Sequence, residues 1–64
     1  MSEVGAFTIF CIELLKERLE ITGAEAYDML NDQGFDYIKM TYPALHTMSK
    51  DLIYDDLLTV VKVS

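Results

Sequence analysis

The chain has 64 residues, a net charge of −6 and one cysteine, so we expect a single domain over residues 1–64 without an internal disulfide. No second cysteine or cluster of histidines stands at zinc spacing, so we expect no metal site and no cofactor. Its five basic side chains are scattered, which disfavours direct binding of nucleic acid and favours a basic protein as the partner.

The N-terminal residues do not have the pattern of a targeting segment. Residues 1–4 lack the positive region and the long apolar core of a signal peptide. No apolar run approaches the roughly 20 residues that span a bilayer. An unpaired thiol is typical of a reducing compartment, so we expect a cytoplasmic protein that is not in the membrane.

Residues 3–21 have the apolar repeat of an amphipathic helix. Ile12 and Leu19 widen its apolar arc, and Ile9 lies near the polar side. An arc this broad exceeds what one small core needs, so we expect the surplus to mediate self-association, as a homodimer, or binding of a protein partner. The apolar side comprises Phe7, Phe10, Cys11, Leu14, Leu15 and Ile21.

Thr22 and Glu25 form a capping-box pattern, which predicts that a second helix covers about residues 24–32. Gly34 follows as the expected left-handed stop. A third helix is expected over about residues 35–45, where Pro43 interrupts the pattern. Either this helix ends before Pro43 or it bends there, and we favour a bend because Leu45 stays in phase with the apolar stripe. The stripe comprises Phe35, Ile38, Tyr42 and Leu45.

Polar residues 49–51 precede a last helix, with Asp55 and Asp56 expected in its first turn, where the helix dipole favours acids. The β-branched tail at residues 60–63 is expected to fray or extend. The predicted fold is therefore all-α, a compact bundle of about four short helices. The apolar face of the last helix comprises Ile53, Leu57, Val60 and Val61.

No set of residues completes a catalytic or metal site. His46 is either a general base, which would need an orienting acid and a cleft, or a cap at the end of the third helix, and we favour the cap. Cys11 lies on an apolar helix face, where a free cysteine behaves as a small hydrophobe. Asp55 and Asp56 are adjacent on a helix and offer no fixed cage for a cation. We therefore do not expect an enzyme.

Tyrosine and methionine are common at protein interfaces and in cores, and the pattern does not separate the two. A helix–turn–helix arrangement of the second and third helices is conceivable, but the chain is acidic and lacks a basic recognition surface. The residues that we assign to a possible interface are Phe7, Phe10, Tyr27, Tyr37, Met40, Tyr42 and His46.

Several short motifs follow one another in a fixed order, namely Cys11-Ile12-Glu13, Asp36-Tyr37-Ile38, and Tyr42 with Leu45-His46-Thr47. In this order they resemble a small bacterial, Firmicutes-type family that is classed as a domain of unknown function. The resemblance implies a gene beside that of an ADP-ribosyltransferase-like protein, and no established catalytic residues. Together with the charge, it leads us to expect a small acidic protein-binding module, an accessory or antitoxin-like partner of a neighbouring protein. The alternative is a regulatory module derived from a helix–turn–helix protein.

Overall fold

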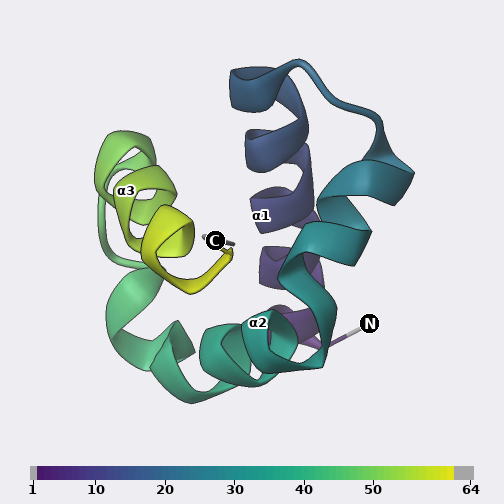
Figure 1. Ribbon diagram of the computed structural model, residues 1–64. Coiled ribbons are helices and arrows are strands. Elements are labelled where there is room, and N and C mark those ends of the chain that lie inside the picture. The colour runs from purple at the N-terminus through teal and green to yellow at the C-terminus, as the bar shows by residue number, and fades with distance from the viewer. Residues whose placement is uncertain (1, 62–64) are drawn as a thin grey trace.

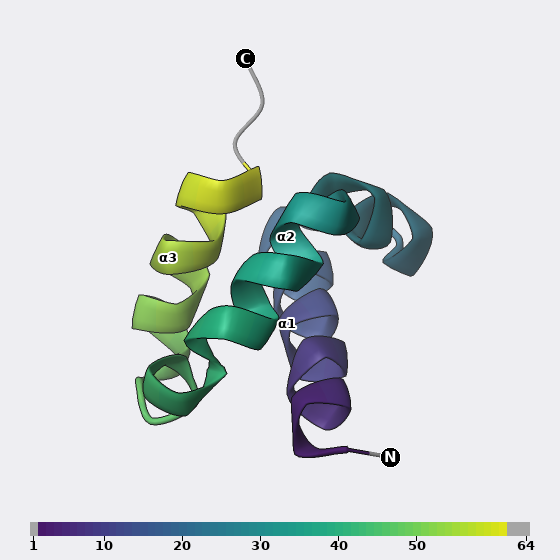
Figure 2. The same ribbon diagram turned by 90° about the horizontal axis from the view of Figure 1, so that it is seen from below.

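The structure, a computed structural model, describes residues 2–61 and contains three helices in that range. These are α1 (Glu3–Leu19), α2 (Gly23–Leu45) and α3 (Lys50–Val61). The long helix α2 bends around the other two, and each helix contacts both of the others (Figure 1, Figure 2). The expected all-α fold is confirmed. Three helices are present where about four were expected, because the two predicted in the middle of the chain form one interrupted helix, α2.

Helix α1 begins at a serine cap and ends at a residue in the left-handed region. The Ser2 hydroxyl accepts a hydrogen bond from the Gly5 N–H at 3.0 Å. Glu20 has a φ of 53°, and its N–H and that of Ile21 both donate to the carbonyl of Lys16. These bonds satisfy a carbonyl at the helix end and stop α1 slightly before the expected position.

The capping box predicted at the start of α2 is confirmed. The Glu25 N–H donates to the Thr22 hydroxyl at 3.1 Å, and the Thr22 N–H donates to the Glu25 carboxylate at 2.8 Å. Two backbone donors that have no partner within the helix are thereby satisfied. This local chemistry fixes where the chain turns from α1 into α2.

Helix α2 is interrupted at Asn31, whose φ is 45° and whose ψ is −166°. This ψ lies outside the left-handed helical region where asparagine is common and close to a region that residues other than glycine rarely adopt, so the backbone is strained here. The side-chain oxygen of Asn31 accepts a hydrogen bond from the Gln33 N–H at 2.9 Å and so caps the helix that restarts. We call residues 23–30 the first arm of α2 and residues 32–45 its second arm.

Gly34 does not stop a helix as expected. No glycine among residues 2–61 has a positive φ, and the residue of α2 with a positive φ is Asn31. Gly34 is buried, and a Cβ added to it would lie 3.0 Å from both the Cβ and the Cδ2 of Leu30. The glycine therefore allows a close approach across the bend, which is a packing role and not a turning role.

The backbone stays helical through Pro43, and α2 ends two residues later at Leu45. No departure from helical angles accompanies Pro43, and the non-helical residue of α2 is Asn31, close to the boundary between the second and third helices that we expected at residues 32–34. Because proline has no N–H, Pro43 cannot donate to the carbonyl of Lys39. The loss of this one bond close to the helix end does not stop the helix.

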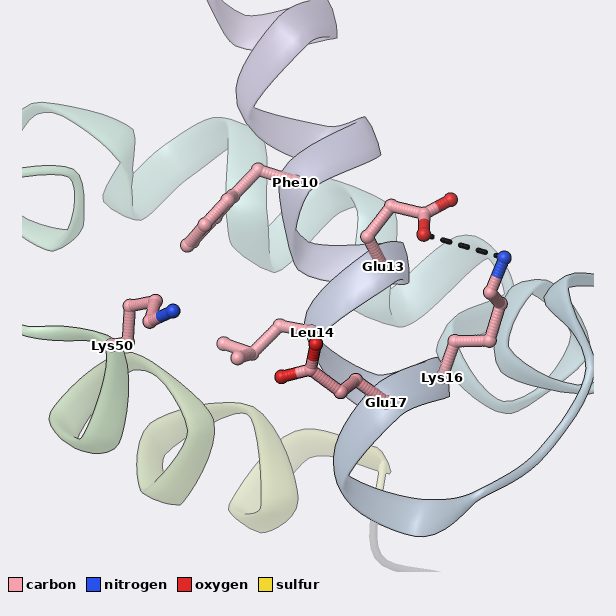
Figure 3. Close-up of a pocket in the computed structure, with 6 residues that line it drawn as sticks. All are labelled: Phe10, Glu13, Leu14, Lys16, Glu17 and Lys50. Carbon is pink, nitrogen blue, oxygen red and sulfur yellow. Dashed lines mark ion pairs between the residues drawn. The ribbon is translucent and has the colours of Figure 1, made fainter.

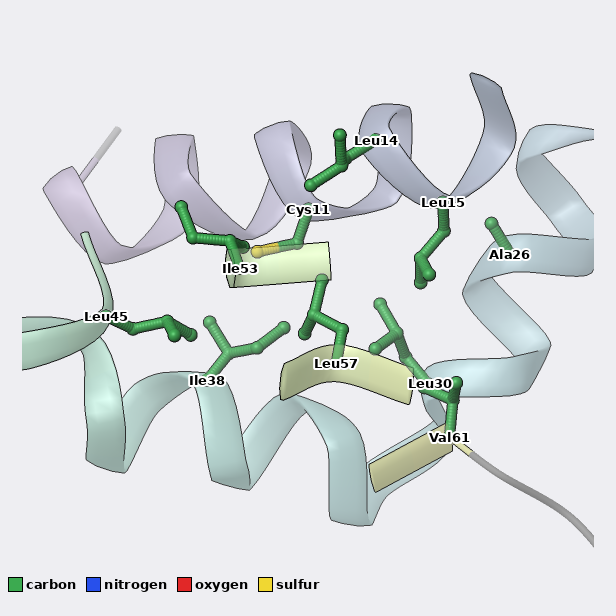
Figure 4. Close-up of a cluster of buried hydrophobic side chains, with 10 residues drawn as sticks. All are labelled: Cys11, Leu14, Leu15, Ala26, Leu30, Ile38, Leu45, Ile53, Leu57 and Val61. Carbon is green, nitrogen blue, oxygen red and sulfur yellow. The ribbon is translucent and has the colours of Figure 1, made fainter. Parts of the chain in front are cut away.

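Ten apolar side chains from all three helices meet in one core (Figure 4). Burying a large aliphatic side chain stabilises a protein by about 1.5–3 kcal/mol, so this core is the main source of stability. Among the described residues no polar or charged side chain is buried. The core comprises Cys11, Leu14 and Leu15 of α1, Ala26, Leu30, Ile38 and Leu45 of α2, and Ile53, Leu57 and Val61 of α3.

Helix α3 starts at Lys50, so Asp51 is the acid in its first turn, and Asp55 and Asp56 lie further along than expected. The predicted apolar face of this helix is confirmed at its three buried residues. Residues 62 and 63 of the expected fraying tail lie outside the described residues. None of the three helices combines the length and the apolarity that crossing a membrane requires, within residues 2–61.

Candidate interaction surface

The cysteine is a core residue, as the sequence indicated. Cys11 is fully buried, and burial raises the pKa of its thiol to about 12. A thiol with such a pKa is protonated at neutral pH and is a poor nucleophile. In the part of the chain that the structure describes, no group of three His, Cys, Asp or Glu side chains could hold a metal ion.

His46 is the C-terminal cap residue of α2, the position that the sequence favoured. Its ring Nδ1 lies 2.5 Å from the carbonyl oxygen of Tyr42, and its ring stacks on that of Tyr42 with centroids 4.4 Å apart. The Thr47 hydroxyl donates to the carbonyl of Ala44 at 2.7 Å. The Tyr42, Leu45, His46 and Thr47 motif thus closes the end of a helix, with Leu45 in the core.

Four of the predicted interface residues form a continuous row of rings where α1 packs on the end of α2. Phe7 stacks on Phe10 at a centroid distance of 5.9 Å and meets the edge of Tyr42 at 5.4 Å. Tyr42 in turn stacks on His46. Phe7, Phe10 and Tyr42 are half-buried, so this row mainly joins the two helices, and only His46 is exposed.

The exposed Tyr27 lies in a different place, on an open apolar groove between α1 and the bend of α2. Tyr27 is 57% exposed, and its ring lies 4.8 Å from the ring of Phe35, at a tilt of 55°. Ile9 of α1, 47% exposed, lines the groove with them. We call this hollow of about 420 Å³ the apolar groove, and it is lined by Val4, Gly5, Thr8, Ile9, Ile12, Tyr27, Phe35 and Lys39.

The bend at Asn31 is what brings the two aromatic rings of the groove together. Tyr27 belongs to the first arm and Phe35 to the second, eight positions later. In a straight helix eight positions span about 12 Å along the axis, which is incompatible with rings 4.8 Å apart. The sequence predicted a helix boundary between Tyr27 and Phe35 but not the angle at which the two segments meet, so the groove was not predicted, although Ile9 on the polar side of its helix was a signal.

Tyr37 and Met40 complete the predicted set and lie outside the groove lining. The Tyr37 hydroxyl donates to the carboxylate of Asp56, and this bond, with burial, raises the pKa of Tyr37. It joins the second arm of α2 to α3. Met40 is 81% exposed on the second arm. The predicted interface residues therefore fall into separate surfaces and not into one patch.

Helices α1 and α3 are joined at the surface by Arg18. Its guanidinium donates to the carboxylate of Asp51 at 2.5 Å and lies over the ring of Tyr54, 5.1 Å from the centroid. The hydrogen bond to Asp51 raises the pKa of Arg18. The positive charge of Arg18 is therefore engaged within the fold. It is less available to the phosphate backbone of a nucleic acid.

A second hollow, of about 360 Å³, lies between α1 and α3 (Figure 3). Glu13 and Lys16 pair at its edge at 3.3 Å, while Lys50 and Glu17 face its apolar floor. Charges of both signs alternate around it, so it has no clear preference for a ligand of one sign. Its lining residues are Phe10, Glu13, Leu14, Lys16, Glu17 and Lys50.

Fold and surface together define a small, acidic, all-helical domain with an open apolar groove. The model of a family described as "Protein of unknown function (DUF3791)" matches residues 6–63, and the chain belongs to this family. The search of curated proteins found no match, and the search of solved structures found none either.

Proposed function

We propose that the protein is an acidic protein-binding module that acts as an accessory or antitoxin-like partner of a second protein in the bacterial cytoplasm. The observation that supports this proposal best is the apolar groove, where Ile9 and Tyr27 are each about half exposed. Exposed apolar side chains that gather in a groove are typical of interaction sites, whereas single ones are common on any surface.

The charge of the domain supports a partner with a basic surface. Eleven acidic side chains stand against five basic ones. Such an excess accelerates encounter with a basic protein and disfavours encounter with nucleic acid. A DNA-binding regulator, the alternative considered from the sequence, has less support, because Arg18 is held by Asp51.

Co-expression with the product of the adjacent gene tests the proposal. The family resemblance implies that this product is an ADP-ribosyltransferase-like protein, and we expect the two to elute together from a sizing column. Light scattering of the complex and of the domain alone gives both stoichiometries and shows whether the free domain is a dimer. A domain that stays partnerless in this experiment contradicts the proposal, and a salt-dependent shift of DNA would favour the regulatory alternative.

A further inference from the structure

We propose that Asn31 is the hinge of a domain exchange, in which α2 straightens into one continuous helix and two copies of the chain trade halves. The N-terminal half comprises α1 and the first arm of α2 (residues 2–30), and the C-terminal half comprises the second arm and α3 (residues 32–61). In the exchanged dimer each N-terminal half packs against the C-terminal half of the other copy. This inference goes beyond the proposed binding function and does not depend on it.

The bent state of α2 places its strain on a single residue. Asn31 has a φ of 45° and a ψ of −166°, a combination that residues other than glycine rarely adopt. Within α2 only Asn31 departs from helical angles, so no flexible linker spreads the strain. A short strained hinge favours exchange between copies, because exchange relieves the strain while the contacts between the halves are kept.

The residues around the hinge are compatible with a straight helix. Residues 28–36 contain no proline, so a continuous helix loses no backbone hydrogen bond there. In the bent state the Gln33 N–H donates to the side chain of Asn31 at 2.9 Å. In a straight helix the same N–H would donate to the carbonyl of Met29, four positions earlier. The side-chain cap is therefore needed only when α2 is bent.

The close packing at Gly34 is also a property of the bent state. A Cβ at Gly34 would lie 3.0 Å from the Cβ of Leu30 in the bent helix. In a regular helix, Cβ atoms four positions apart are about 5–6 Å from each other. A straight α2 thus has room for a side chain at this position, and the bent α2 does not.

A straight α2 does not fit within one folded chain. The 23 residues of α2 would span about 35 Å as a continuous helix, whereas the folded chain extends 26 Å along its longest axis. Straightening therefore separates the two halves.

Separation of the halves divides the core. Leu15 and Leu30 of the N-terminal half meet Ile38 and Leu57 of the C-terminal half in the buried cluster (Figure 4). An opened single chain would expose these side chains to water, which costs more than the strain at one residue. The halves of a second copy cover them again with the same contacts. The exchanged dimer therefore keeps the core and removes the strain.

Exchange also removes the apolar groove, because Tyr27 and Phe35 lie on opposite sides of the hinge. Their rings are 4.8 Å apart in the bent state. Eight positions of a straight helix place the two residues about 12 Å apart along its axis. The exchange is therefore a concentration-dependent switch between a monomer that has the groove and a dimer that lacks it.

Two substitutions at Asn31 test the hinge in opposite directions. Asn31→Ala favours the straight helix, and Asn31→Gly relieves the bend and weakens the straight helix. Each protein is unfolded in denaturant and refolded at millimolar concentration, and light scattering after a sizing column gives the dimer fraction. Each dimer contains two hinges, so we expect Asn31→Ala to lower the dimer dissociation constant at least about tenfold and Asn31→Gly to raise it by a similar factor.

Gly34→Ala tests the hinge from a second position. The new Cβ has room in the straight helix and not in the bent one, so this variant is also expected to enrich the dimer. Gly23→Ala makes the same change outside the bend, where the new Cβ would meet only the Cδ of Lys16 at 3.8 Å. This control is expected to leave the dimer dissociation constant unchanged within about twofold.

The ion pair of Arg18 and Asp51 distinguishes an exchanged dimer from one formed by surface contact. The pair joins the two halves, so in an exchanged dimer its members come from different copies. Arg18→Asp places two acids at this contact and Asp51→Arg places two cations, so each variant alone has a repulsive pair. When the two variants are refolded together, opposite charges meet in both units of a mixed dimer. We expect native mass spectrometry to show mixed dimers in excess over random pairing.

Glu13→Lys mixed with Lys16→Glu is the matched control. These two residues also form an ion pair, at 3.3 Å, but both lie on α1 and stay in the same half. Exchange cannot bring opposite charges together in this mixture, so no excess of mixed dimers is expected.

Three results overturn the inference: no dimer in any variant, equal dimer fractions for Asn31→Ala and Asn31→Gly, or no greater excess of mixed dimers for the Arg18 and Asp51 variants than for their controls. The proposed function fails in a different experiment. A domain that stays partnerless in co-expression contradicts the binding function and leaves the exchange intact.

Discussion

Asn31 and Pro43 lie in the same helix and behave in opposite ways. Pro43 is the residue that ordinarily breaks a helix, yet the backbone of α2 stays helical through it. Asn31 is an unremarkable polar residue in sequence, yet the helix is interrupted there at a φ of 45°. The difference shows that packing of the whole chain, and not local propensity alone, decides where α2 bends.

The core explains the position of the bend. Ala26 in the first arm and Ile38 in the second are both fully buried in one core. In a straight helix, two residues twelve positions apart would point about 120° away from each other. A bend between them lets both face α1 and α3, and Asn31 lies between them. A bend at Pro43 would come too late to align these two residues.

The largest change in stability is expected from the packing beside the bend, at Gly34. Gly34→Ala should destabilise the protein by about 2 kcal/mol, because the new Cβ would lie 3.0 Å from two atoms of the buried Leu30. In an ordinary helix the same change stabilises by up to about 1 kcal/mol. Thermal unfolding followed by circular dichroism measures the difference, and 1 kcal/mol corresponds to roughly 4–8 °C in a domain of this size.

Gly23→Ala is the matched control for this prediction. A Cβ at Gly23 would meet only the Cδ of Lys16, at 3.8 Å, so this variant should keep or slightly raise the melting temperature. An unchanged melting temperature for Gly34→Ala would show that the close packing across the bend is not needed.

The next largest change in stability is expected at Asn31 itself. Asn31→Ala should cost about 1.5 kcal/mol, because alanine cannot cap the Gln33 N–H and tolerates a positive φ poorly. Asn31→Gly also loses the cap but relieves the strain, so it should be nearly neutral. Chemical denaturation of both variants measures the loss of the cap and the relief of the backbone strain separately. Equal losses in the two would mean that the strain is negligible and the cap decides.

The sequence was sufficient for features governed by neighbouring residues. The capping box of Thr22 and Glu25, the buried Cys11 and the cap at His46 were all predicted, and all three depend on local spacing or local hydrogen bonds. The apolar stripes also predicted most of the core. These features need no knowledge of how distant segments pack.

An interruption near residues 32–34 was predicted, but its position at Asn31, the direction of the bend and the groove could not be predicted in this way. The position of the bend depends on which side chains of α1 and α3 must be covered, and the pairing of Tyr27 with Phe35 follows from the bend. Gly34 was assigned the left-handed position because glycine adopts it most easily. In the structure Gly34 is needed for its small size instead, beside Leu30.

Pro43→Ala provides the counterpart to Asn31→Ala, with the opposite sign. Pro43 is exposed, so its removal loses little packing, and alanine restores an N–H that can donate to the carbonyl of Lys39. We expect a gain of about 1 kcal/mol, measured by the same thermal unfolding. A loss of stability would show that proline stiffens the unfolded chain enough to outweigh the missing bond.

The smallest effect tests what holds the second arm in place after the bend. Tyr37→Phe removes the hydrogen bond to Asp56 of α3 and should cost about 0.5–1 kcal/mol.

The hydrogen bond and burial raise the pKa of Tyr37, so the folded protein holds the phenolic proton more tightly than the unfolded chain does. This contribution is therefore fully present below about pH 10 and is lost as the pH rises through the folded pKa. Unfolding measured across alkaline pH should show the difference between the wild-type protein and Tyr37→Phe shrinking above pH 10 or so. Tyr27→Phe is the control, because no residue in the described range accepts a hydrogen bond from the Tyr27 hydroxyl. A difference that stays constant with pH would mean that the arm is held by the bend and the core alone.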